Sequence, residues 1–163
     1  MTLPTAKPSV STTEHSACLY HHILVGVDLS EEAPLVLDKA VKIARAFNAQ
    51  LSIAHVLEPI TFAYGGDMPL DISEVQEQQI QRAEKTLQAL AQNTDMPIQQ
   101  EHVLVGQPAD ELHFLAQQQG ADLIIVGSHG RKGFALLLGS TPNSVLHGAT
   151  CDVLAVFVHQ KTD

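Results

Sequence analysis

Apolar residues occur in five short, nearly continuous runs that are bounded by polar residues, glycine or proline. Runs of this kind, about four to eight residues long, are typical of strands that are buried on both faces of a sheet. The predicted strands are residues 23–28, 50–56, 98–105, 122–127 and 152–158. The third of these is more polar than the other four.

Between these runs, apolar residues recur every three or four positions, which is the spacing of one face of an amphipathic helix. The predicted helices are residues 31–47, 72–93, 108–120 and 140–147. In the first helix, the predicted buried face consists of Leu35, Val36, Ala40, Ile43 and Phe47. We expect Ser30 to be the N-cap of this helix, and Pro34 is compatible with its first turn.

Strands and helices alternate along the whole pattern. Strands separated by helical connections are parallel and are joined by right-handed crossovers. The sequence therefore predicts an α/β fold with an open, doubly wound parallel sheet and helices on both faces. Ligands of such sheets bind beyond the carboxyl ends of the strands, where the winding direction reverses.

The length of 163 residues fits one domain, and the amino-terminal segment differs from the rest in composition. Residues 1–18 contain Pro4, Pro8 and several Ser and Thr, with few large apolar side chains. This composition is typical of a flexible tail. The predicted folded domain is residues 19–160.

The charge balance excludes several classes of partner. Nine basic and 18 acidic residues give a net charge of -9, so we expect neither nucleic-acid nor anionic membrane binding. Cys18 and Cys151 lie far apart and outside any CxxC spacing, which favours a reducing compartment. The N-terminus has no apolar stretch typical of a signal peptide or membrane span, so we expect a cytoplasmic protein.

The loop after the fourth predicted strand carries the most informative chemistry. Gly127 and Gly130 follow that strand, and Gly139, Ser140 and Thr141 open the next helix. Glycines allow the backbone to approach a ligand, and a helix start offers unpaired N–H groups and a positive dipole to phosphate. The alternative is that the glycines only shape turns and Ser140 only caps a helix. From the residues alone, both interpretations stay open.

Three further residues near the expected ligand edge have two interpretations each. The Asp28 carboxylate can accept a hydrogen bond from an adenine amino group or cap the following helix. His55 ends the second strand, where a packed, hydrogen-bonded histidine is commoner than a catalytic one. His129 lies within the glycine loop, where solvent exposure is the usual outcome.

Familiar catalytic and metal-binding motifs are missing from the sequence. None of the nine histidines has an HxxxH or HExxH spacing, so no metal site is predicted. The chain also lacks GxxxxGK[ST], a GxGxxG after the first strand, and GxSxG. We therefore predict no catalytic residues and no enzyme activity, with slow ATP hydrolysis as the weakest alternative.

Six segments resemble successive signatures of the universal stress protein family. They are residues 23–30 (ILVGVDLS), 54–56 (AHV), 106–112 (GQPADEL), 122–131 (DLIIVGSHGR), 139–141 (GST) and 151–156 (CDVLAV). The likeness extends over about residues 20 to 158. It implies a five-stranded parallel sheet in the order 3-2-1-4-5, and a homodimer formed through the last strand, from Val153 to Val158. The apolar content of that strand is consistent with pairing at a sheet edge.

The chain is similar to the branch of the family with an ATP-binding motif, G-x2-G-x9-G-[ST]. Here eight residues, not nine, separate Gly130 from Gly139, and Pro142 removes one N–H from the helix start. The resemblance implies that ATP, with or without Mg²⁺, is bound by Val27, Asp28, Val56, Val126, Gly127, Gly130, Gly139, Ser140 and Thr141. In that arrangement Asp28 and Val56 contact adenine, Val126 and Gly127 line the ribose, and the remaining glycines and hydroxyls hold phosphates.

The leading hypothesis is a nucleotide-binding protein that regulates a stress response. The alternative is a dimeric protein-interaction module that binds no nucleotide.

Overall fold

The structure is a computed structural model that describes residues 19–60, 72–129 and 140–158. Strands and helices alternate along these residues, as the hydrophobic pattern predicted. In chain order they are β1 (His22–Gly26), α1 (Ala33–Phe47), β2 (Gln50–Leu57), α2 (Ile72–Gln92), β3 (Gln100–Val105), α3 (Pro108–Gln119), β4 (Leu123–His129), α4 (Ser140–Gly148) and β5 (Asp152–Val158). The predicted tail, residues 1–18, lies outside the described residues.

The strands form one parallel sheet in the order β3-β2-β1-β4-β5. This confirms the predicted topology. β1 lies at the centre, with Gly26 opposite Ala54 of β2 on one side and Val126 of β4 on the other. β3 and β5 are the two edge strands of the sheet.

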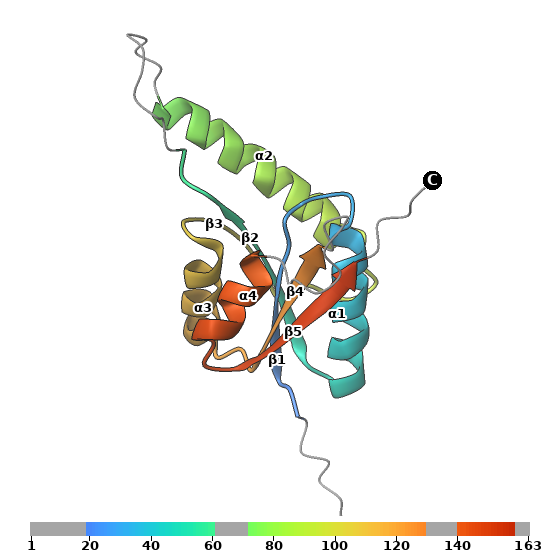
Figure 1. Cartoon of the computed structure of the whole chain (residues 1–163). Helices are drawn as coiled ribbons and strands as arrows, with labels where there is room; N and C mark the ends of the chain where they lie inside the picture. The colour runs from blue at the N-terminus through green and yellow to red at the C-terminus, as the bar shows by residue number, and fades with distance from the viewer. Residues whose placement is uncertain (1–18, 61–71, 130–139, 159–163) are drawn as a thin grey trace, which may run out of the picture.

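Helices cover both faces of the sheet, and each face has its own core. Figure 1 shows α1 on one side of the strands and α3 and α4 on the other. Alternate side chains of a strand point to opposite faces, so Ile23 and Val25 pack in the α1 and α2 core while Leu24 packs in the α3 and α4 core. All three side chains are fully buried, and burial of each one stabilises the fold by roughly 1.5–3 kcal/mol.

Two predictions about the first helix are wrong. Its N-cap is Glu32, without a side-chain cap, while Ser30 Oγ accepts the Glu32 N–H at 3.3 Å in the preceding turn. Leu35 is 55% exposed, because the buried stripe of α1 runs through Val36 and Ala40. Pro34 does lie in the first turn, as predicted.

The α3 helix begins and ends at the residues that the sequence indicated. Pro108 occupies the first turn, and Gly120 follows the last turn with a φ of 64°. A left-handed residue at this position suits glycine, whose missing Cβ removes the steric penalty. The Gly120 turn directs the chain into β4.

Candidate functional site

The carboxyl ends of β1 and β4 form the switch point of the sheet. β1 continues into α1 on one face, whereas the helices that flank β4, α3 and α4, lie on the other face (Figure 1). The helices that follow β1 and β4, α1 and α4, therefore lie on opposite faces of the sheet. Parallel sheets bind their ligands at such a point.

The β1 end is a short, well-defined turn. Val27 donates its N–H to Ala54 O at 2.9 Å, and its side chain is 7% exposed within the core of α1 and α2. Asp28 is exposed, and its Oδ1 accepts the Ser30 N–H at 3.0 Å. The carboxylate thus stabilises the turn before α1 and does not cap the helix itself.

Leu29, at the centre of this turn, adopts a left-handed conformation with a φ of 58°. This conformation costs a non-glycine residue roughly 1–2 kcal/mol and is stable only where the surroundings enforce it. Here the side chain of Leu29 packs against the α1 and α2 core. This conformation could not be predicted from the sequence, because leucine is not a residue associated with it.

The β2 end lies next to the β1 turn. Val56 is half-buried and packs against the α3 and α4 core. The neighbouring His55 is also half-buried, and its Nδ1 lies 2.7 Å from Val27 O. Since a carbonyl oxygen only accepts, Nδ1 carries the hydrogen and donates it. The interpretation of His55 as a packed, hydrogen-bonded histidine agrees with this contact.

The β4 end combines buried and accessible residues. Val126 is 2% exposed and packs in the α3 and α4 core, whereas Gly127 is half-exposed. A side chain packed in the core contacts protein, so Val126, like Val27, can reach a ligand only through backbone atoms. Ser128, which the sequence reasoning did not single out, is 5% exposed just beyond Gly127.

The expected phosphate side is described only in part. Ser140 begins α4, Thr141 is half-buried and Pro142 is buried. Gly130 and Gly139 lie outside the described residues. Because α4 begins at Ser140, its N-terminus can supply N–H groups and a positive dipole that suit an anion.

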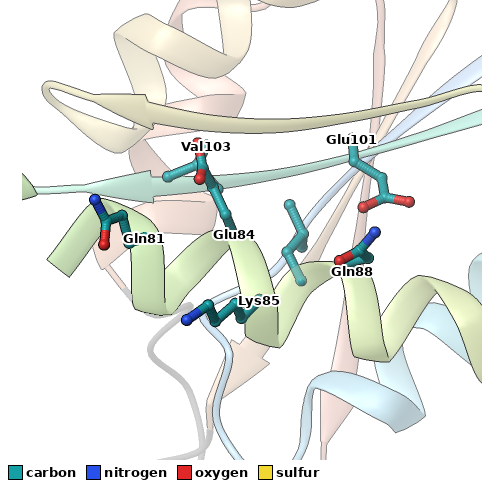
Figure 2. Close-up of a pocket in the computed structure, with 7 residues that line it drawn as sticks. Gln81, Glu84, Lys85, Gln88, Glu101 and Val103 are labelled. Carbon is teal, nitrogen blue, oxygen red and sulfur yellow. The ribbon is translucent and has the colours of Figure 1, made fainter. Parts of the chain in front are cut away.

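A separate groove of about 440 Å³ lies between α2 and β3 (Figure 2). It is lined by Gln81, Glu84, Lys85, Leu87, Gln88, Glu101 and Val103. Five of these seven residues are polar or charged, and none of them is a predicted site residue. The groove is therefore a feature of the edge of the sheet and not of the switch point.

A polar cluster occupies the opposite, amino end of the sheet. We call His22, Ser52, His102 and Gln119 the amino-end cluster. His22 Nδ1 donates to Gln119 O at 3.1 Å, so its Nε2 accepts from the Ser52 hydroxyl at 2.8 Å. The Gln119 amide contacts His102 Nε2 and donates to Gln100 Oε1 at 2.7 Å. Burial lowers the pKa of His102, and the neighbouring His22 adds to the effect.

Asp122 closes the same end of the sheet. Its carboxylate accepts the backbone N–H groups of His21 at 2.8 Å and His22 at 3.2 Å. Burial raises the pKa of Asp122, but these hydrogen bonds together with the His21 ring outweigh it, so the net pKa is below its usual value. Asp122 thereby joins the start of β4 to the start of β1.

Two features are not found within the described residues. No helix in them is both long and apolar enough to cross a membrane. Over the same ranges, no group of three or more His, Cys, Asp or Glu side chains is arranged to hold a metal ion.

Sequence and structure comparisons connect this geometry to known proteins. The model of the Universal stress protein family matches residues 19–156. Universal stress protein A homolog 1 from Coxiella burnetii (strain RSA 493 / Nine Mile phase I) is 41% identical over 142 residues, which are 86% of this chain and 99% of the relative.

Two solved structures share the fold and contain a nucleotide. A universal stress protein in complex with cAMP has a TM-score of 0.56 and 30% identity, covering 85% of this chain and 97% of that one. The universal stress protein from Archaeoglobus fulgidus in complex with dAMP has a TM-score of 0.60 and 27% identity, covering 84% and 98%. The family model and the identity to the Coxiella protein, together with the sheet order, show that the chain belongs to the universal stress protein family.

Proposed function

We propose that this chain binds an adenine nucleotide, ATP in the first place, at the carboxyl ends of β1, β2 and β4. The observation that carries the proposal is the fixed turn at Asp28, which holds an exposed carboxylate at the switch point of the sheet. The cAMP and dAMP complexes of two family members support adenine as the base. An exposed carboxylate suits the amino group of adenine, since that group is a hydrogen-bond donor.

Each part of the nucleotide has its own partners in this proposal. Adenine lies between Asp28 and Val56, and the ribose lies along the backbone at Val27, Val126 and Gly127. The phosphates are held by Gly130, Gly139, Ser140 and Thr141, with Mg²⁺ bound through the phosphates. The start of α4 at Ser140 supports this placement, because a helix N-terminus favours anions.

The role is regulatory binding in the cytoplasm, not turnover. The half-buried His55 at this end of the sheet has its Nδ1 hydrogen bonded to Val27 O, so this nitrogen is engaged by a backbone carbonyl. Bound nucleotide then changes the order of the surrounding loops or the contacts between subunits, and thereby signals the state of the cell in a stress response.

Isothermal titration with ATP and AMP, with and without Mg²⁺, tests the proposal. We expect saturable binding by the wild-type chain and a Kd about tenfold higher for Asp28→Ala, which removes one charged hydrogen bond to the base. Asp38→Ala is the matched control, because Asp38 is an exposed aspartate on α1 that pairs with Lys42. Absence of both heat and thermal stabilisation at millimolar ATP would contradict the proposal.

A second candidate function is a homodimeric interaction module. β5 is an edge strand on which Leu154 is 38% and Phe157 is 56% exposed, and such an edge favours pairing with another strand. Light scattering at micromolar concentration should then show a dimer, weakened by Leu154→Arg. A dimer that binds no nucleotide would favour this candidate, and a monomer would dismiss it.

A further inference from the structure

His55 lies at the point where β1 and β2 stop pairing. The paired register of the two strands ends with Gly26 opposite Ala54, whereas β2 remains paired with β3 as far as Leu57. Beyond that point the side chain of His55 bridges the two strands, with Nδ1 donating to Val27 O at 2.7 Å. A side chain thus continues the connection where the regular ladder ends.

The carbonyl that His55 holds belongs to the peptide unit that leads into Asp28. A peptide unit is planar, so fixing its oxygen also fixes the orientation of the Asp28 N–H and the direction in which Asp28 leaves the strand. The N–H of Val27 is itself bonded to Ala54 O at 2.9 Å. Both the N–H and the C=O of Val27 are therefore hydrogen bonded to residues of β2.

This anchoring precedes the strained part of the turn. Leu29 has a φ of 58°, and Asp28 Oδ1 accepts the Ser30 N–H at 3.0 Å. Strained backbone persists only where neighbouring contacts enforce it. The His55 bond is one such contact on the strand side of the turn, and the Asp28 bond is another on the helix side.

We propose that His55 is a positioning residue for adenine recognition, whose ring N–H fixes the Val27–Asp28 peptide so that the Asp28 carboxylate meets the base. This inference rests on the proposed function, because it assigns to His55 the geometry of the same site. His55 acts through Val27 and Asp28 and takes no part in any chemical step.

The opposite end of the sheet supplies a matched comparison. There Ser52 of β2 donates to His22 Nε2 of β1 at 2.8 Å, so the same two strands are again joined by a histidine. Ser52 is fully buried and lies at the amino end, away from the proposed site. Ser52→Ala therefore removes one hydrogen bond between β1 and β2 without touching the Asp28 turn.

The test compares three variants by ATP titration under conditions in which each is folded. His55→Leu removes the donor at similar volume, and we expect its Kd for ATP to rise about five- to tenfold. His55→Asn keeps an N–H at the δ position, and we expect a Kd within about twofold of wild type. Ser52→Ala should be less stable to urea than wild type but bind ATP with unchanged affinity.

Three results would overturn the inference. They are an unchanged Kd for His55→Leu, an equal loss for His55→Asn and His55→Leu, and a loss of affinity for Ser52→Ala as large as for His55→Leu. The last would show that general destabilisation, and not the His55 hydrogen bond, weakens binding.

Amide hydrogen exchange of the ligand-free proteins separates this inference from the proposed function. We expect the amides of Leu29 and Ser30 to exchange faster in His55→Leu than in wild type and to be unchanged in Ser52→Ala. If wild type binds no ATP, the proposed function and the recognition role both fail, and the exchange pattern decides whether His55 fixes the turn. Equal exchange in wild type and His55→Leu would overturn that anchoring as well.

Discussion

The two ends of the sheet use the same residue type in opposite ways. At the amino end, His22 is 9% exposed and both ring nitrogens are hydrogen bonded, one to Gln119 and one to Ser52. At the carboxyl end, His55 is half-buried and its Nδ1 supports an exposed turn. The first histidine completes a buried network, while the second positions a surface that is accessible to a ligand.

Two aspartates show the same contrast. Asp122 accepts the backbone N–H groups of His21 and His22, which lie 101 and 100 residues away in the sequence. Asp28 accepts the N–H of Ser30, two residues away. The bonds of Asp122 join two strands that are distant in the sequence, whereas the bond of Asp28 to Ser30 constrains only the turn before α1. Stability and the proposed binding site are thus separated along the strands, and substitutions can test this separation.

Replacing His22 should produce the largest loss of stability. His22→Leu leaves the Ser52 hydroxyl and Gln119 O without their partner in a buried site, and we expect a loss of roughly 2–4 kcal/mol in the free energy of unfolding. Urea unfolding monitored by circular dichroism measures this loss. ATP affinity of the folded fraction should not change, because the site lies at the other end of the sheet.

The double variant His22→Leu/Ser52→Ala provides the control. Removing both partners of a hydrogen bond leaves no orphaned group, so the double variant should be more stable than the sum of the two single losses predicts. If the two single losses of stability simply add in the double variant, the hydrogen bond between His22 and Ser52 does not stabilise the amino end of the sheet. A loss of ATP affinity in His22→Leu would show that the two ends are not separate.

Replacing Asp122 or Asp28 should lower the free energy of unfolding by less than replacing His22 does, and the loss should be larger for Asp122. Asp122→Ala removes two hydrogen bonds from backbone N–H groups to a charged acceptor, and we expect a loss of about 2 kcal/mol near neutral pH. Asp28→Ala removes one exposed, local bond, and we expect less than about 1 kcal/mol. Urea midpoints of both variants measure the difference, and equal losses would contradict the separation of the two ends.

Lowering the pH should remove the contribution of Asp122 to the stability of the fold. The pKa of Asp122 is lowered in the folded chain, so its contribution is present above the ordinary aspartate pKa and is lost as the pH falls through the folded value. The stability difference between wild type and Asp122→Ala should therefore shrink below about pH 4. A difference that stays constant on acidification would show that the charge of Asp122 plays no part.

The fold follows from the pattern of apolar residues. Continuous runs such as residues 23–28 indicate strands buried on both faces, and the alternation with helices dictates parallel pairing. Proline and glycine at the ends of α3 set its boundaries through local conformation alone. The strand order, however, came from the family resemblance, because periodicity does not specify which strands are neighbours.

Features that depend on contacts between distant residues were not predictable. The sequence showed two adjacent histidines at His21 and His22, but the partner of His22 is Gln119, 97 residues further on. Leu35 was predicted to be buried because three- and four-residue spacing allows two neighbouring faces, and only packing against the sheet selects between them. Ser30 was predicted to cap α1, but its hydroxyl accepts the Glu32 N–H in the turn before the helix begins, and Glu32 occupies the N-cap position.

The smallest predicted effect is a pH dependence at the amino end. The pKa of His102 is lowered in the folded chain by burial and by His22, so the unfolded chain takes up a proton first as the pH falls. Stability linked to His102 is therefore present above the ordinary histidine pKa, about 6.5, and is lost as the pH falls through it toward the folded value. Because His102 is only half-buried, we expect His102→Gln to reduce the fall in Tm below about pH 6.5 by at most about 2 °C. His147→Gln, which removes an exposed ring on α4, controls for the loss of one histidine. If both variants show the same pH profile of Tm, the position of His102 beside His22 makes no pH-dependent contribution to stability. The contrast between the two ends then rests on His22 and Asp122 alone.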